Sequence, residues 1–189
     1  MNIPYPESGR KSWLLGGIAV LAAIALYVQR SGSAIWSPYL YAEDGSVFLQ
    51  QQLLQGVSSV VTPFAGYLHL VPRLTAMLAA PFGAVYAPEV YALCALLVMV
   101  WTAISIAMCR LSYAWLLPVL MFLVPHNGEV FGTITNAQWL MACALPLIAL
   151  TPAPESRAAR FNQLVFVFTA SLTGPFCVFA APLFVYRWW

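Results

Sequence analysis

Long apolar runs separated by short polar stretches make up most of the chain. The first run, from Trp13 to Val28, is apolar throughout and follows Arg10-Lys11. Its length would also suit a signal peptide, but no A-x-A cleavage site follows it. We therefore expect an uncleaved helix that enters a membrane from the cytoplasm. The run from Val90 to Met108 is unbroken and long enough to span a bilayer.

Three further apolar runs follow the second one. Two of them, Ser112–Val124 and Gln138–Leu150, contain an internal proline and are about 13 residues long. At 1.5 Å per residue each reaches about 20 Å, less than the roughly 30 Å hydrocarbon core, so these helices need flanking residues, local thinning or burial among neighbours. The last run, Leu164–Tyr186, is interrupted by Thr173-Gly174-Pro175 and is compatible with one kinked span or with two half-helices.

Helical periodicity distinguishes the stretch Val47–Val57 from these runs. At 100° per residue its apolar side chains fall on one broad face and its glutamines on the opposite face. The apolar set is Val47, Leu49, Leu53, Leu54 and Val57, and the polar set is Gln51, Gln52 and Gln55. This pattern predicts a helix over about 45–57 that lies in the membrane interface, with Asp44 and Gly45 at its start.

The stretch 67–87 has two interpretations. Its apolar part, Leu74–Tyr86, reaches spanning length only when His69 and Arg73 are included, and it contains a proline and a glycine. If the stretch does not cross, three later arginines share the cytoplasmic side with the N-terminus, and if it crosses they move outside. These arginines are Arg110, Arg157 and Arg160. Because basic residues accumulate inside, we favour a juxtamembrane or re-entrant helix over about 67–83.

Composition makes lipid the solvent for much of this chain. Apolar residues are 62% of the 189 residues and charged residues 7%, against about 45–50% and about 25% in a soluble domain. We therefore expect an all-α, polytopic transmembrane helix bundle, a single domain over 1–189, with juxtamembrane helices on its outer face and the lipid bilayer as its partner. The predicted spans are about 12–29, 90–109, 112–125, 137–151 and 163–186.

The net charge and the spacing of the cysteines exclude some classes of function. The net charge is +2 and no basic run occurs, so we expect no nucleic-acid partner. The four cysteines lie in apolar runs without CxxC spacing, which favours small buried hydrophobic residues over a metal or redox site. They are Cys94, Cys109, Cys143 and Cys177.

With this topology the rare polar side chains gather on the outer side, in two loops. They are Glu43, Asp44, His69, Arg73, His126, Glu129, Asn136 and Gln138. Ionisable groups at membrane depth are costly and usually mark function. The convergence of two loops therefore predicts a polar site that a helical scaffold holds at the outer surface.

Structural roles are the alternative for the first loop. Asp44 could cap the amphipathic helix, and Glu43 could be a solvated neighbour. His69 and Arg73 are spaced i and i+4, which places them on one helix face. They could form an anion site or could extend to the lipid headgroups.

Similar alternatives apply to the second loop. Glu129 could be an ordinary loop residue, and His126 beside a proline could be structural. Asn136 and Gln138 could be helix-start residues, because Thr135-x-x-Gln138 has the spacing of a capping box.

Layout and short motifs together resemble the GT-C superfamily of integral-membrane glycosyltransferases. An N-terminal span precedes the acidic stretch Glu43-Asp44-Gly45, and Gly66–Arg73 is similar to the juxtamembrane segment that follows it in the family. Asn127-Gly128-Glu129 stands where the second acidic motif would fall. Such enzymes, among them protein O-mannosyltransferases and aminoarabinose transferases, use polyprenyl-phosphate-linked sugars. The resemblance implies such an enzyme, or an N-terminal portion of one, in a bacterial inner membrane.

The resemblance also implies roles for the outer residues. Asp44 would be the catalytic base or metal-organising carboxylate, with Glu43 beside it and Glu129 facing it. Transfer from a lipid phosphate needs a base for the acceptor hydroxyl and cationic help for the departing phosphate, for which Arg73 and His69 are suited. The positive end of the helix that begins near Asn136 and Gln138 would add to substrate binding.

A divalent cation is the one cofactor that we expect. Mg²⁺ or Mn²⁺ could bridge Asp44 and the phosphate, because both prefer oxygen ligands.

A non-catalytic membrane protein is the competing hypothesis. A flippase subunit for lipid-linked sugars or a transporter fragment would place polar residues near the bilayer midplane, in paired broken helices. The predicted clustering at one surface favours the enzyme, whereas the break at Thr173-Gly174-Pro175 keeps the transporter open.

Overall fold

The computed structural model describes residues 10–111, 113–125 and 129–188. Helices account for 78% of the chain, and no strand occurs among the described residues, which confirms the all-α prediction. Two helical stretches in this part of the chain, Leu14–Ser31 and Leu70–Ala107, are long and apolar enough to cross a membrane.

The helical elements follow one another with short connections. In chain order they are α1 (Arg10–Ser31), α2 (Ser33–Trp36), π-helical η1 (Asp44–Leu49), α3 (Gln50–Gln55), 3₁₀-helical η2 (Gly56–Val61), α4 (Leu70–Ala79), 3₁₀-helical η3 (Ala80–Phe82), α5 (Gly83–Ala107), 3₁₀-helical η4 (Ala114–Leu116), α6 (Leu117–Leu123), α7 (Ala137–Leu150), α8 (Arg157–Thr173) and α9 (Phe176–Trp188).

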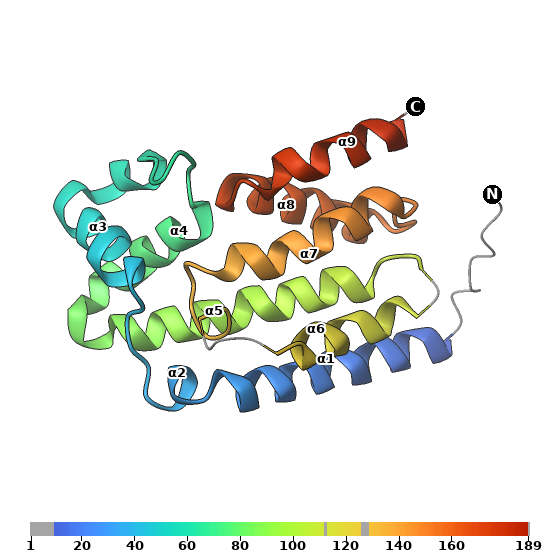
Figure 1. The fold of residues 1–189 in the computed structure, drawn as a ribbon, viewed down its shortest axis with the longest axis horizontal. Helices are drawn as coiled ribbons and strands as arrows, with labels where there is room; N and C mark the ends of the chain where they lie inside the picture. Colours follow the sequence, from blue (N-terminus) through green and yellow to red (C-terminus); the bar gives the residue numbers. More distant parts are fainter. Residues whose placement is uncertain (1–9, 112, 126–128, 189) are drawn as a thin grey trace.

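The long helix α5 is the centre of a layered bundle. With 25 residues it is about 37 Å long, and α1 and α6 pack along one side of it and α7 along the other (Figure 1). Alanines lie where the helices cross, among them the fully buried Ala23, Ala103 and Ala144. Such small side chains allow the close backbone approach that helix pairs in lipid use.

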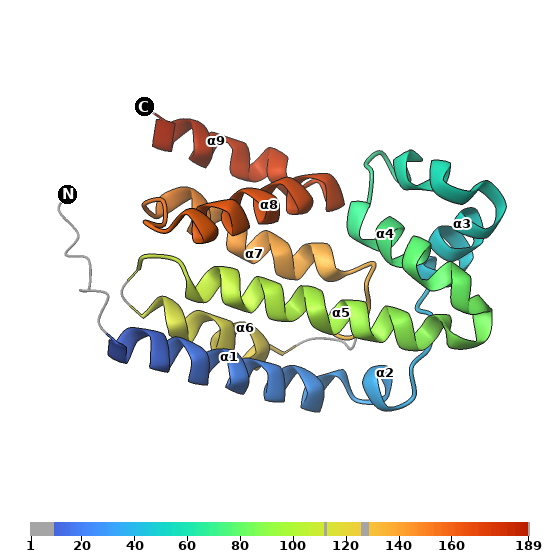
Figure 2. The same cartoon turned by 180° about the vertical axis from the view of Figure 1, so that it is seen from behind.

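The segment 163–186 consists of parts of two helices, α8 and α9, that run in opposite directions (Figures 1 and 2). Near the start of α8, Asn162 accepts a hydrogen bond from Trp101 in the last third of α5, at 2.8 Å. At its end, Thr173 Oγ1 accepts from the backbone N–H of Val71, at 3.3 Å.

Helix α9 returns along α7. Its Arg187 Nη1 donates to the carbonyl oxygen of Ile148 near the end of α7, at 2.8 Å. The sequence left one kinked span and two half-helices open, and the chain reverses at Gly174-Pro175. The start of α1 and the end of α9 therefore lie at the same end of the bundle (Figure 1).

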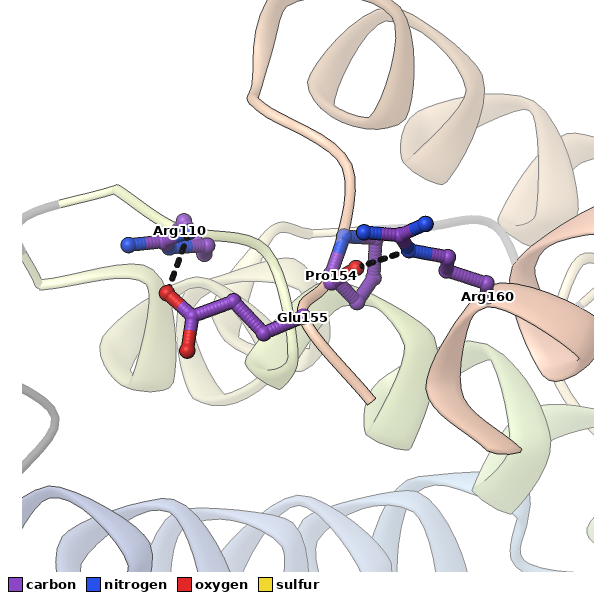
Figure 3. A network of polar contacts seen from close by, with 4 residues as sticks. All are labelled: Arg110, Pro154, Glu155 and Arg160. Carbon is purple, nitrogen blue, oxygen red and sulfur yellow. Dashed lines mark hydrogen bonds and ion pairs between the residues drawn. The ribbon is translucent and has the colours of Figure 1, made fainter. Parts of the chain in front are cut away.

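Charged side chains divide between the two ends of the bundle. One end, here the basic end, holds the start of α1 together with Arg110, Arg157, Arg160 and Arg187. Figure 3 shows Arg110 Nη1 2.9 Å from Glu155 Oε1, and Arg160 Nε donating to the carbonyl oxygen of Pro154 at 2.6 Å. The opposite, acidic end holds Glu43, Asp44, Glu89 and Glu129, together with the two arginines Arg30 and Arg73.

A lobe formed by η1, α3, η2 and α4 projects from the acidic end (Figures 1 and 2). Helix α4 has 10 residues, about 15 Å, and it folds back on the beginning of α5. The turn between them includes Pro81 in η3 and Gly83, whose φ of 72° is a conformation that glycine adopts without strain. Helix α4 therefore lies at the acidic end and does not run along the bundle.

The amphipathic pattern predicted over 45–57 is wrong in its phase. Leu49 is buried, whereas Leu54 and Val57 are 77% and 73% exposed, so the five apolar residues do not share one face. The reason is that η1 is π-helical: the N–H of Gln50 bonds to the carbonyl of Gly45, five residues back. This wider turn shifts the side chains of α3 relative to a 100° helix. Helix α3 also ends at Gln55, so Val57 belongs to η2 and not to the same helix.

Candidate functional site

The carboxyl group of Asp44 joins the two segments that sequence analysis placed in separate loops. It is 2% exposed at the first position of η1. Its Oδ1 accepts hydrogen bonds from the backbone N–H of Thr135, at 3.1 Å, and from Thr135 Oγ1, at 2.6 Å. Asp44 therefore does not cap its own helix, which was its predicted structural alternative.

The backbone around Asp44 is fixed from two directions. Its N–H donates to the carbonyl of Tyr41 at 2.7 Å, and its carbonyl accepts from the hydroxyl of Tyr91 in α5 at 3.0 Å. Burial raises the pKa of Asp44 to about 7, against the opposing effect of the Thr135 hydrogen bonds. A carboxyl group in this range can both take and release a proton near neutral pH.

The second segment differs from the predicted capping box. Asn136 is the N-cap of α7 without a side-chain capping bond, and Thr135 directs its hydroxyl to Asp44 instead. Gln138 Nε2 donates to the Tyr67 hydroxyl at 3.3 Å, and Gln138 Oε1 is buried without a partner. The side chains of Thr135 and Gln138 thus bond to other elements and not to the first turn of α7, because those partners lie within reach.

His69 lies in an aromatic cluster of the lobe. Its ring stacks on Tyr67, with centroids 3.9 Å apart, and contacts Phe48 and Phe64 at 5.2 and 5.5 Å. Burial lowers the pKa of His69, and the charge of Arg73 acts in the same direction. As the N-cap of α4 it has φ of 57°, the left-handed region that non-glycine residues seldom adopt.

The guanidinium of Arg73 lies under η1 and α3. The residue has no exposed surface, Nη1 donates to Gln51 Oε1 at 2.7 Å, and Cζ lies 5.1 Å from the centre of the Phe48 ring. The Nε and Nη2 groups have no hydrogen-bond partner among the residues that the structure describes. Arg73 therefore does not extend to the surface, which was one predicted alternative.

Glu43 and Glu129 lie near the same tyrosine. Partial burial and then the charges of Glu129, Glu43 and Asp44 raise the pKa of Tyr41. The carbonyl of Glu129 accepts hydrogen bonds from Asn136 Nδ2 and Thr133 Oγ1, both at 2.8 Å. The structure thus brings the predicted acids of both loops to one end. His126 and the Asn127-Gly128 part of the second motif lie outside the described residues.

Three residues of the site were not predicted. Thr135 holds Asp44, Tyr91 holds the Asp44 backbone, and Gln51 binds Arg73. No sequence signal marked them, because each is an ordinary polar residue and none is close in sequence to its partner.

The predicted divalent cation has no cluster of protein ligands among the described residues. Within the described ranges, no group of three or more His, Cys, Asp or Glu side chains could hold a metal ion. A cation bridging Asp44 and a phosphate would draw ligands from its substrate, and it stays a prediction.

Comparison of the chain with protein-family models, with curated proteins and with solved structures finds no match.

Proposed function

We propose that the chain is a polytopic membrane glycosyltransferase, or a portion of one, which transfers a sugar from a polyprenyl-phosphate donor at the outer face of a membrane. The observation that carries this proposal is the buried carboxyl of Asp44, which Thr135 holds at one end of an apolar helix bundle and whose pKa is about 7. This group is suited to act as a base.

The distribution of charge supports the membrane orientation. More arginines lie at the basic end, with the start of α1, than at the acidic end, which holds Arg30 and Arg73, so the basic end faces the cytoplasm under the positive-inside rule. The acidic end, with Asp44, then faces outward. Helices α6, α7 and α9 are shorter than the roughly 30 Å hydrocarbon core and share the bilayer with the longer α1 and α5.

A groove supports a lipid-linked donor over a water-soluble one. It has a volume of about 570 Å³ and lies between α5, α6 and α7, with Ile106, Leu120 and Leu140 among its apolar lining. Its lining also includes Val130 and Phe131, which precede Thr135 in the same segment. A hydrocarbon chain in this groove would end close to the segment that holds Asp44.

The proposed reaction uses Asp44 as the general base. Its carboxylate takes the proton of an acceptor hydroxyl, the acceptor oxygen forms a bond to the anomeric carbon, and the bond from that carbon to the phosphate oxygen breaks. The electron pair leaves with the lipid phosphate, whose negative charge a cation, for which Arg73 is the candidate, would stabilise. The negative charges of Glu43 and Glu129 contribute to the electrostatic field around the acceptor hydroxyl.

The deciding experiment replaces Asp44 with asparagine in the full chain, reconstituted in liposomes with a polyprenyl-phosphate sugar donor. The amide in Asp44→Asn keeps an oxygen that can accept from Thr135 but has no basic carboxylate, so sugar transfer should fall by at least about 100-fold. Glu155→Gln, at the basic end, is the matched control and should retain transfer. Wild-type transfer by Asp44→Asn would refute this mechanism.

A further inference from the structure

We propose that Arg73 presents two parallel N–H donors, from Nε and Nη2, which bind the oxyanion of a phosphate group beneath η1 and α3. The choice of a lipid phosphate as the ligand rests on the proposed glycosyltransferase function. The existence of an oxyanion site rests on the contacts of Arg73 alone.

The first support is that one nitrogen of the Arg73 guanidinium donates a hydrogen bond within the protein, whereas its other two have no acceptor among the described residues. Nη1 donates to Gln51 Oε1 at 2.7 Å, whereas Nε and Nη2 are buried without a partner. In a planar guanidinium, Nε–H and the N–H of Nη2 point the same way and match two oxygens of one phosphate or carboxylate. The contact with Gln51 therefore leaves the complete two-donor edge for a ligand.

The second support is the uncompensated charge. The residue has no exposed surface, and among the described carboxylates none forms an ion pair with it. A buried charge without a counter-ion is strongly unfavourable, and buried donors are almost always satisfied. An anion that enters this space would supply both the missing charge and the missing acceptors.

The third support is the way in which the guanidinium plane is held. Phe48 lies against it, with Cζ 5.1 Å from the ring centre, and Gln51 fixes its far corner. Both residues belong to the covering η1–α3 segment. Because this segment encloses the guanidinium, the oxyanion enters when α3 moves away from α4, while Asp44 at the start of η1 stays bonded to Thr135.

The test measures binding of farnesyl phosphate, farnesol and inorganic phosphate to the full chain in detergent by calorimetry. Farnesyl phosphate should bind more tightly than farnesol, because only the phosphate reaches the donor pair. Arg73→Lys keeps a charge but has no two-donor edge, and it should lose about tenfold in affinity for farnesyl phosphate. Arg73→Met should bind farnesyl phosphate no better than farnesol.

Inorganic phosphate distinguishes the source of the ligand. Binding of both phosphates assigns the site to the phosphate group itself, and binding of farnesyl phosphate alone assigns it to a lipid headgroup. Arg30→Met is the matched control, because Arg30 is also at the acidic end but stacks on Phe131 and donates to the Leu123 carbonyl. It should leave the preference for farnesyl phosphate unchanged.

Thermal unfolding provides an independent readout. Removing an uncompensated buried charge should raise the unfolding temperature of ligand-free Arg73→Met above that of the wild type. A purely structural arginine would give a lower temperature.

Equal affinities of wild type and Arg73→Lys for farnesyl phosphate, or no preference of the wild type for farnesyl phosphate over farnesol, would overturn the proposal. Phosphate binding that depends on Arg73 together with full transfer by Asp44→Asn would refute the catalytic mechanism and leave this site standing.

Discussion

At the scale of single residues, burial decides the chemistry of Asp44. A carboxylate at the start of a helix commonly accepts from its own first turn, which lowers its pKa. Asp44 instead accepts from Thr135, 91 residues away, in a buried setting where desolvation outweighs these two hydrogen bonds. The same residue type at the same position therefore becomes a proton acceptor for neutral pH.

The raised pKa of Asp44 predicts the pH dependence of stability. Because the pKa is about 7 in the folded chain and 3.8 is the ordinary value, the folded state binds the proton more tightly than the unfolded state. This contribution is complete below the ordinary pKa and is lost as the pH rises through about 7. Thermal unfolding of the wild type in detergent should therefore shift downward between about pH 4 and about pH 8, relative to Asp44→Asn. Parallel curves for both proteins would contradict the raised pKa.

Thr135 gives a second prediction at this scale. Its hydrogen bonds lower the pKa of Asp44, so Thr135→Val should raise this pKa further by about one unit. If Asp44 is the base, the acidic limb of the pH–rate profile should move to higher pH by the same amount. Thr135→Ser keeps the hydroxyl and should restore the wild-type profile. A lower rate without a shift of the limb would assign Thr135 a structural role only.

Sequence reasoning identified the charged residues of the site but not their partners. Asp44 and Arg73 stood out because ionisable residues are rare in this chain. Thr135 and Gln51 are ordinary polar residues whose roles depend on which elements pack together, and a single sequence does not encode that choice locally. The capping-box spacing at Thr135 was misleading for the same reason, since a tertiary partner replaced the local one.

At the scale of elements, the π-helical turn of η1 explains why a helical-wheel argument failed. Leu49 before the α-helical turn of α3 is buried, and Leu54 within it is exposed, while Gln52 between them is buried and bonded to Ser59. The leucines of α3, Leu53 and Leu54, are exposed while Gln52 is buried, and exposed leucines side by side suit an apolar environment. The lobe is therefore expected to place this leucine surface in lipid.

Spin labels test the environment of this surface. A nitroxide on Leu54→Cys, in a background without the native cysteines, should be more accessible to oxygen than to a water-soluble nickel complex, because oxygen concentrates in lipid. A label on Glu129→Cys, which is exposed at the same end, should show the opposite preference. Equal access of the nickel complex at both positions would show that the lobe stands in water.

At the scale of the whole molecule, the sequence predicted which segments form helices, but it did not predict the direction in which each helix runs through the bundle. The apolar runs correspond to α1, α5, α6 and α7 because each run needs internally bonded backbone. The run 163–186 is long enough for one span, but Gly174-Pro175 interrupts it, and packing against α7 turns α9 back. That outcome depends on contacts with a neighbouring helix, so hydropathy could not decide it.

This reversal makes the side of the C-terminal segment a test of the entire topology. With α8 and α9 antiparallel, position 187 lies at the basic end with position 157, whereas a single span would place it with position 129. In intact cells, a membrane-impermeant maleimide should label Glu129→Cys and should reach Arg157→Cys and Arg187→Cys only after permeabilisation. Position 129 serves better than 44 as the outer probe, because Asp44 is buried. Labelling of position 187 from outside would separate it from the other arginines, and the positive-inside argument that orients Asp44 outward would lose its basis.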